Sequence, residues 1–155
     1  MKLMDFVSPA NVILDLDGNS KEELLGRMVQ KLLDAGKIKD PSRLLASLME
    51  RERVMTTGIG RGIAVPHAIS AEVSEQLIVL GRAPRGVDYD SLDRAPVHFV
   101  FLLVGSPASS DRHLKTLARI SRLIQHSNFI EEIKQAATVE DILRILSEED
   151  AKHKG

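Results

Sequence analysis

Apolar residues recur at two spacings along this chain, one typical of β-strands and one typical of helices. Alternating or nearly continuous apolar runs at 12–17, 62–65, 76–83 and 97–105 predict strands. The last of these runs, VHFVFLLVG, is almost entirely apolar, which predicts a central strand covered on both faces. Between the runs, apolar positions repeat every three to four residues, which predicts amphipathic helices.

Local signals mark where these helices begin and end. Ser20 and Glu23 form a capping box ahead of an apolar stripe, and Gly36 is placed to end that helix. Asp40 and Pro41 are suited to begin a second helix at once. Both helices therefore lie between the first two predicted strands.

A third helix is predicted from about Ser110 to His126. Its polar face carries four basic residues, Arg112, Lys115, Arg119 and Arg122. Two short helices follow, the last one opened by a capping box at 138–141, and the tail from 147 is expected to fray. Strands that alternate with helices predict an α/β fold, a three-layer α/β/α sandwich on a mixed sheet, as one domain over 1–155.

Composition narrows the classes of function. Net charge is -1 and aromatic residues make up only 3%, so neither an electrostatic nor a base-stacking surface for nucleic acid is expected. The chain has no cysteine, which excludes disulfides, thiolate metal sites and a cysteine nucleophile. It shows no signal-peptide core and no apolar run long enough to span a bilayer, so we expect a cytoplasmic protein without direct membrane insertion.

The stretch TTGIGRGIAVPHA departs from both periodic patterns. Its alternate glycines match neither the dinucleotide fingerprint nor the P-loop spacing; they are Gly58, Gly60 and Gly62. Glycines permit positive φ and close backbone approach, so this stretch could bind an anion through its amides beside His67, whose backbone Pro66 restrains. A glycine-rich turn with a solvated histidine explains the same residues equally well, and the two readings stay open at this point.

Two further residues are candidates for the same site. His113 lies in the first turn of its predicted helix, on the apolar face, just after the most apolar strand. Ligand sites in α/β sheets gather at the carboxyl ends of strands, although a core histidine bonded to backbone is the alternative. Arg51 directly precedes the glycine stretch, and an isolated arginine is more often a surface charge. The spacings typical of zinc sites and serine hydrolases are absent from the sequence.

The segments RERVMTTGIGRGIAVPHA and DRHLKTLARIS together resemble the IIA domains of the bacterial phosphoenolpyruvate-dependent phosphotransferase system (PTS), fructose/mannitol class, which includes the nitrogen-regulatory IIA proteins. The resemblance covers nearly the whole chain. It implies that His67 accepts a phosphoryl group and that His113 and Arg51 bind its oxygens. It also implies a phosphate-binding loop made of Thr57, Gly58, Gly60 and Gly62. Ala68 departs from the pattern, because many relatives have glycine there and a basic residue soon after.

The resemblance further implies a phosphotransferase component that needs no cofactor, metal ion or nucleotide. The donor would be an HPr-like phosphohistidine carrier protein, and Nε2 of neutral His67 would attack phosphorus. The motif is most similar to nitrogen-regulatory relatives, which implies a regulatory protein as the downstream target. A sugar-specific IIA that passes phosphate to the cysteine of a separate IIB domain is the first alternative, and a binding module without transfer activity is the second. Three isoleucines are candidates for an apolar docking rim, although each could instead be a core residue: Ile59, Ile63 and Ile69.

Overall fold

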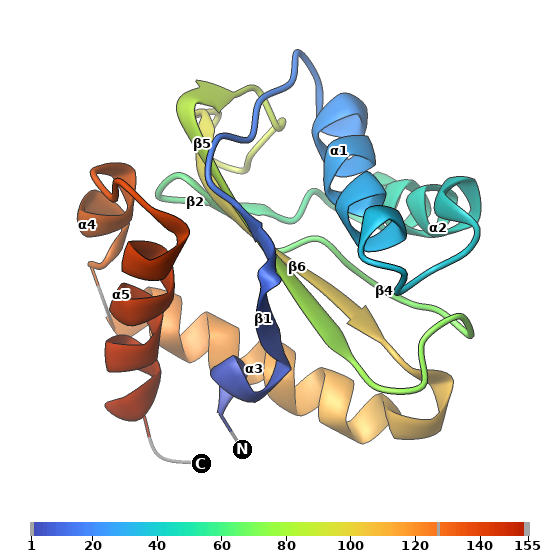
Figure 1. Cartoon of the computed structure of the whole chain (residues 1–155). Helices are drawn as coiled ribbons and strands as arrows, with labels where there is room; N and C mark the ends of the chain where they lie inside the picture. The colour runs from blue at the N-terminus through green and yellow to red at the C-terminus, as the bar shows by residue number, and fades with distance from the viewer. Residues whose placement is uncertain (1, 127, 154–155) are drawn as a thin grey trace.

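The computed structural model describes residues 2–126 and 128–153. Within these residues, a mixed six-stranded sheet lies between two layers of helices (Figure 1). The strands are β1 (Val7–Ile13), β2 (Gly58–Gly60), β3 (Ile63–Ala64), β4 (His67–Ile69), β5 (Leu77–Val87) and β6 (Val97–Gly105). The helices are α1 (Lys21–Asp34), α2 (Pro41–Val54), α3 (Ser110–His126), α4 (Ile130–Lys134) and α5 (Val139–Ala151), with short 3-10 helices η1 (Leu3–Phe6) and η2 (Pro107–Ser109). The predicted α/β/α sandwich is confirmed.

The sheet has the strand order β1-β5-β6-β3-β2, and β4 also pairs with β6. Strands β5 and β6 are antiparallel, whereas β1 is parallel to β5, and β3 and β4 are both parallel to β6. Ile63 lies opposite Phe99 and His67 lies opposite Leu103, so β3 and β4 follow one another along the same edge of β6. Pro66 lies in the gap between them and has no backbone N–H to continue the pairing.

The two faces of the sheet carry separate hydrophobic cores. Helices α1 and α2 cover one face, where Leu24 and Leu48 pack with Val100. Helices α3, α4 and α5 cover the other, where Ile120 packs with Phe101. Side chains of β6 alternate between the two cores, which is why its sequence is apolar throughout, as predicted.

The predicted N-caps of α1, α2 and α5 are confirmed. Ser20, Asp40 and Thr138 each accept a hydrogen bond from a backbone N–H three residues later, at 3.1 Å. The reciprocal carboxylate bonds of the two capping boxes go to the residue before the cap, Asn19 or Ala137, rather than to the cap itself.

The first strand lies earlier in the chain than predicted, at Val7–Ile13 rather than 12–17. Pro9 has no backbone N–H, and β1 is at the edge of the sheet, where such a residue is tolerated. The pairing with β5 shifts register between Val7 and Val12, the span that contains Pro9. Leu16, which the predicted strand included, is buried from the loop that follows β1.

The prediction that the tail frays from 147 is wrong for the residues that the structure describes, because α5 continues to Ala151; residues 154–155 lie outside the described part. Asp150 is 2% exposed and accepts hydrogen bonds from Nε of Arg119 at 2.7 Å and from the N–H of Met4 at 3.1 Å. Arg119 is only 1% exposed, so it does not belong to the polar face of α3 predicted for it. This buried ion pair holds the last turn of α5 to α3.

Candidate functional site

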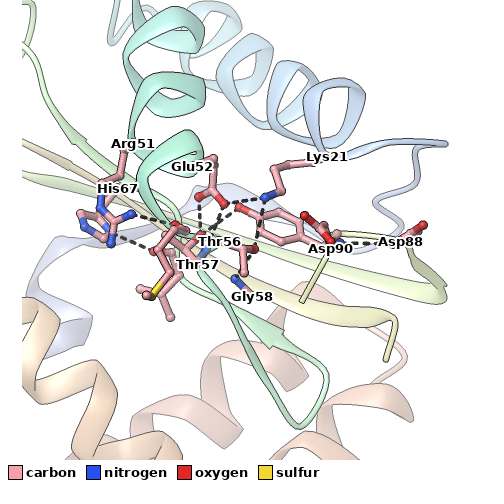
Figure 2. Close-up of polar contacts among 12 residues, drawn as sticks. Lys21, Arg51, Glu52, Thr56, Thr57, Gly58, His67, Asp88 and Asp90 are labelled. Atoms are coloured by element: carbon pink, nitrogen blue, oxygen red, sulfur yellow. Dashed lines mark hydrogen bonds and ion pairs between the residues drawn. The ribbon is translucent and has the colours of Figure 1, made fainter. Parts of the chain in front are cut away.

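His67 begins β4, and its Nδ1 lies 2.9 Å from the carbonyl oxygen of Val65 (Figure 2). A carbonyl oxygen only accepts hydrogen bonds, so Nδ1 of the neutral ring carries the proton and donates to it. Nε2 then holds the free lone pair. Pro66 breaks the sheet pairing between the two residues, and the Val65 carbonyl supplies the acceptor that fixes the tautomer of His67.

His113 lies beside His67, with ring centroids 5.7 Å apart and ring planes inclined by 55°. It projects from the first turn of α3 and is 6% exposed. Its ring rests on Gly105, the last residue of β6, where an added Cβ would lie only 2.4 Å from Nδ1 of His113. Gly105 therefore leaves the space that the His113 ring needs, a role that the sequence pattern did not reveal.

Arg51 lies in the last turn of α2, and Figure 2 shows its guanidinium beside the His67 ring. Its Nη1 donates to the carbonyl oxygen of Met55 at 2.8 Å. The positive charge is close enough to act on the ionisation of His67. The structure thus brings together His67, His113 and Arg51, which come from a short strand and two different helices.

Both histidines are adapted to the neutral state. Burial lowers the pKa of His67 most, the Val65 hydrogen bond opposes this, and the Arg51 charge lowers the pKa further. Burial also lowers the pKa of His113, and the charge of His67 adds to the effect. Neutral imidazole is the nucleophilic form, so His67 is ready to attack at neutral pH. Among the described residues, no three His, Cys, Asp or Glu side chains are grouped as a metal site.

Arg61 and Gly62 form the tight turn between β2 and β3, directly after Gly60, the last residue of β2. Gly60, Arg61 and Gly62 have φ values of 99°, 59° and 78°, and two consecutive positive φ values are typical of a two-residue hairpin turn. The N–H of Arg61 donates to Asp93 at 3.2 Å. The backbone freedom expected of these glycines is used in this turn.

The turn lies far from His67 along β6. The Gly62 carbonyl accepts the N–H of His98 and of Phe99, whereas the Pro66 carbonyl accepts the N–H of Leu103. Four or five strand residues separate these points, or about 13–17 Å. The predicted phosphate contacts of Gly60 and Gly62 are therefore not supported by this geometry.

Thr57 is directed at Glu52 instead of toward the site (Figure 2). Its N–H donates to Oε1 of Glu52 at 2.9 Å, and its hydroxyl donates to Oε2. Lys21 pairs with the same carboxylate at 3.0 Å. The Tyr89 hydroxyl lies 3.0 Å from the Thr57 oxygen, and because that hydroxyl already donates to Glu52, Tyr89 is the donor. Burial, with the charge of Glu52, raises the pKa of Tyr89, so the phenol keeps its proton.

Gly58 is similarly committed to the fold. Its N–H donates to Oγ1 of Thr56 at 3.2 Å, and an added Cβ would lie 2.4 Å from Oγ of Ser91. The amides of Thr57 and Gly58 thus have protein partners, and their predicted role in binding phosphate is not supported either. Together with Glu52, they fix the segment that follows Arg51.

Residues 5–149 match the family model described as "Phosphoenolpyruvate-dependent sugar phosphotransferase system, EIIA 2". The chain belongs to this family. It is similar to the fructose-specific EIIABC component of Bacillus subtilis, with 33% identity over 150 residues that cover 97% of this chain and 24% of that protein, about a quarter of its length. It is 30% identical over 143 residues to the fructose-specific EIIA component of Haloferax volcanii, covering 92% of this chain and 93% of that one.

Nitrogen regulatory proteins are similar to this IIA domain over almost their full length. The one from Bradyrhizobium diazoefficiens is 29% identical over 147 residues, which cover 95% of each chain. The crystal structure of nitrogen regulatory protein IIA-Ntr from Neisseria meningitidis superposes with a TM-score of 0.83 at 23% identity, covering 92% of this chain and 97% of that one. IIA mannitol from Escherichia coli gives 0.75 at 20% identity, covering 90% and 97%. These likenesses show the shared fold.

Large apolar side chains are exposed next to the site residues of this IIA domain. Met55 follows α2 and Leu114 follows His113, and they are 60% and 66% exposed. Ile69 is 41% exposed, as predicted for a rim residue. Ile63 is only 2% exposed because it packs in the core under α3, so it is the core residue of the two alternatives and does not belong to the rim. Within the described residues, no helix is long and apolar enough to cross a membrane.

Proposed function

We propose that this protein is a PTS phosphocarrier that accepts a phosphoryl group on Nε2 of His67 from an HPr-like phosphohistidine protein in the cytoplasm. The observation that carries the proposal is the bond from Nδ1 of His67 to the Val65 carbonyl at 2.9 Å. This bond leaves Nε2 as the nucleophile, next to a second histidine and an arginine. Membership of the EIIA family supports the same reading.

The transfer needs no proton movement on His67. A bond forms between phosphorus and Nε2 while the phosphorus–nitrogen bond of the donor breaks, and the electron pair of the broken bond stays on the donor nitrogen. Nδ1 keeps its proton on the Val65 carbonyl, so the His67 ring takes up a positive charge, and a donor ring that is protonated on its other nitrogen leaves as neutral imidazole. Positioning and electrostatics supply most of the catalysis in phosphoryl transfer. Arg51 and His113 are placed to bind the phosphoryl oxygens as the group passes between the two proteins. The phosphoramidate donor already has a good leaving group, so we expect no metal ion or nucleotide to be required.

The donor would dock over the exposed apolar residues around the site. Each of these apolar residues lies close to a site residue. In the sequence, Met55 comes four residues after Arg51, and Leu114 directly follows His113. Ile69 comes two residues after His67 and, like the His113 ring, lies against Gly105. A transient complex needs only a small interface, at the low end of the usual range of buried area, about 1,200 Å². The apolar rim lets such a complex form without a deep pocket.

For the downstream step, we propose regulation of a target protein. The motif TTGIGRGIAVPH and the full-length similarity to nitrogen regulatory proteins support this reading. Phosphorylation adds roughly two negative charges beside His67, which changes the affinity of this face for a protein target. A sugar-specific role is the second candidate, favoured by the fructose-specific relatives at 33% and 30% identity. In that role the phosphoryl group would pass to the cysteine of a IIB domain.

A transfer assay separates these possibilities. The protein is incubated with enzyme I, an HPr-like carrier and labelled phosphoenolpyruvate, with EDTA and without ATP. Rapid, acid-labile labelling of the wild type but not of His67→Ala is expected. Labelling that requires ATP and Mg²⁺ would contradict the proposal, and no labelling under either condition would favour a binding module. Adding a fructose-type IIB domain then decides the downstream step, because fast loss of the label indicates the sugar-specific role.

A further inference from the structure

Two buried polar atoms without a hydrogen-bond partner lie on the α3 side of the sheet, near the site. They are Nδ1 of His113 and Oε1 of Gln76. Gln76 is 3% exposed and directly precedes β5. Leu77 pairs with Val104, so the antiparallel register places Gln76 opposite Gly105, the residue on which the His113 ring rests.

Thr116 ties Gln76 to the same helix. Nε2 of Gln76 lies 2.7 Å from Oγ1 of Thr116, one turn after His113 in α3. The Thr116 hydroxyl donates its hydrogen to the carbonyl of Arg112 at 2.8 Å. The amide atom that faces Thr116 must therefore be the nitrogen, which leaves the amide oxygen as a buried acceptor. The orientation of the Gln76 side chain is thus fixed by its partner.

The tautomer and the protonation state of His113 together decide whether this acceptor is used. A neutral ring with its proton on Nδ1 could donate to Gln76, but its Nε2 would then be an acceptor and could not bond a phosphoryl oxygen. When the neutral ring carries its proton on Nε2, Nδ1 is itself an acceptor, and two acceptors cannot bond. A protonated ring donates from both nitrogens. A dianionic phosphoryl group on His67, whose ring centroid is 5.7 Å away, favours this protonated form.

We propose that Gln76 is a positioning residue whose amide oxygen accepts a hydrogen bond from Nδ1 of protonated His113 and thereby aims Nε2–H at the phosphoryl group on His67. The phosphoryl part of this inference rests on the proposed function. The bond to protonated His113 does not depend on it. The proton comes from solvent when the phosphoryl group arrives and returns when the group leaves, and no covalent bond of Gln76 changes.

The other charges around His113 are few. His67 faces it from β4, and the charge of Arg51, on α2, acts on His67. Asp111 and Arg112, on its own helix, are exposed. Gly105 contributes no charge. Burial and His67 both lower the pKa of His113. A hydrogen bond from the protonated ring to the Gln76 oxygen would act in the opposite direction and raise this pKa, which a titration can measure.

The test compares Gln76→Met with Thr116→Val. Gln76→Met removes the acceptor, whereas Thr116→Val removes the partner of the Gln76 nitrogen and keeps the oxygen. In the unphosphorylated protein, NMR titration of the His113 ring should show a lower pKa in Gln76→Met than in the wild type, and an unchanged pKa in Thr116→Val. In the transfer assay, Gln76→Met should lower kcat on the order of tenfold, as expected for a donor left unpaired, with KM for the carrier unchanged.

Two results would overturn the inference. One is an unchanged His113 pKa in Gln76→Met, and the other is an equal loss of kcat in both variants, which would mean that the amide only joins α3 to the sheet. If Gln76→Met does not fold, Gln76→Glu keeps an oxygen acceptor and should raise the His113 pKa; a fall would count against the proposal. Failure of the wild type to accept phosphate would refute the proposed function alone, because the titration decides the Gln76 bond independently.

Discussion

Replacing Gly105 with alanine should slow phosphoryl transfer strongly while the protein still folds. The added Cβ would lie 2.4 Å from Nδ1 of His113 and 2.8 Å from Cδ1 of Ile69, whereas ordinary contacts begin at 3.4 Å. The His113 ring must therefore move by about 1 Å, because the surrounding core is close-packed. A misplacement of about 1 Å at a catalytic group costs on the order of a hundredfold in rate. Overpacking should also lower the free energy of unfolding by about 1–3 kcal/mol.

A second glycine in the same sheet provides the control. A Cβ on Gly81 would lie 2.6 Å from Cδ2 of Leu16 and 3.1 Å from Cε of Met28, so Gly81→Ala overpacks the opposite core to a similar degree. Both variants are compared for melting temperature and for the rate of phosphoryl transfer from the carrier. We expect similar destabilisation but slow transfer only in Gly105→Ala. Wild-type transfer in Gly105→Ala, or an equal loss in Gly81→Ala, would refute the placement of His113 in the site.

Three further predictions concern the charges of the site. Arg51→Ala and His113→Ala should each slow transfer by about a hundred- to a thousandfold. The control is Arg53→Ala, at an exposed position on the same helix as Arg51, which should transfer at the wild-type rate. Equal transfer rates in all three variants would remove Arg51 and His113 from the site. Glu52→Gln should lower the free energy of unfolding by about 2–3 kcal/mol, because it leaves Lys21 without its carboxylate. Urea titration measures this loss. If the loss in the double variant with Lys21→Met equals the sum of the two single losses, the pair is not coupled. Burial lowers the pKa of both site histidines below 6.5, so the folded state binds fewer protons than the unfolded chain, and the free energy of unfolding should fall as pH drops below 6.5. Replacing both histidines with glutamine should flatten that fall, and an unchanged pH profile would contradict the lowered pKa values.

The sequence predicted the helices well because their signals are local. The caps at Ser20, Asp40 and Thr138 and the bounds of α3 depend on residues within one turn of each helix end. The short strands β2 and β4 were not predicted, because three residues carry too little pattern. The end of α5 depends on Arg119, 31 residues away in the chain, and no local signal reports that contact.

The candidate site was predicted in part. The resemblance singled out His67, His113 and Arg51, and the structure brings them together. The sequence resemblance could not show that the carbonyl of Val65 fixes the tautomer of His67, or that Gly105 makes room for His113. Both features depend on how separate strands and helices meet. The glycines were assigned to phosphate because positive φ serves anion-binding loops and hairpin turns alike, and only the register with β6 distinguishes the two.

The position of the phosphoryl group on the imidazole ring shows whether the Val65 hydrogen bond selects the nucleophilic nitrogen of His67. Protein labelled with ¹⁵N in its histidines is phosphorylated by the carrier and studied by ¹⁵N and ³¹P NMR. We expect phosphorus on Nε2 of His67, with Nδ1 still protonated and bonded to the Val65 carbonyl. Phosphorus on Nδ1 of His67, or on His113, would contradict it.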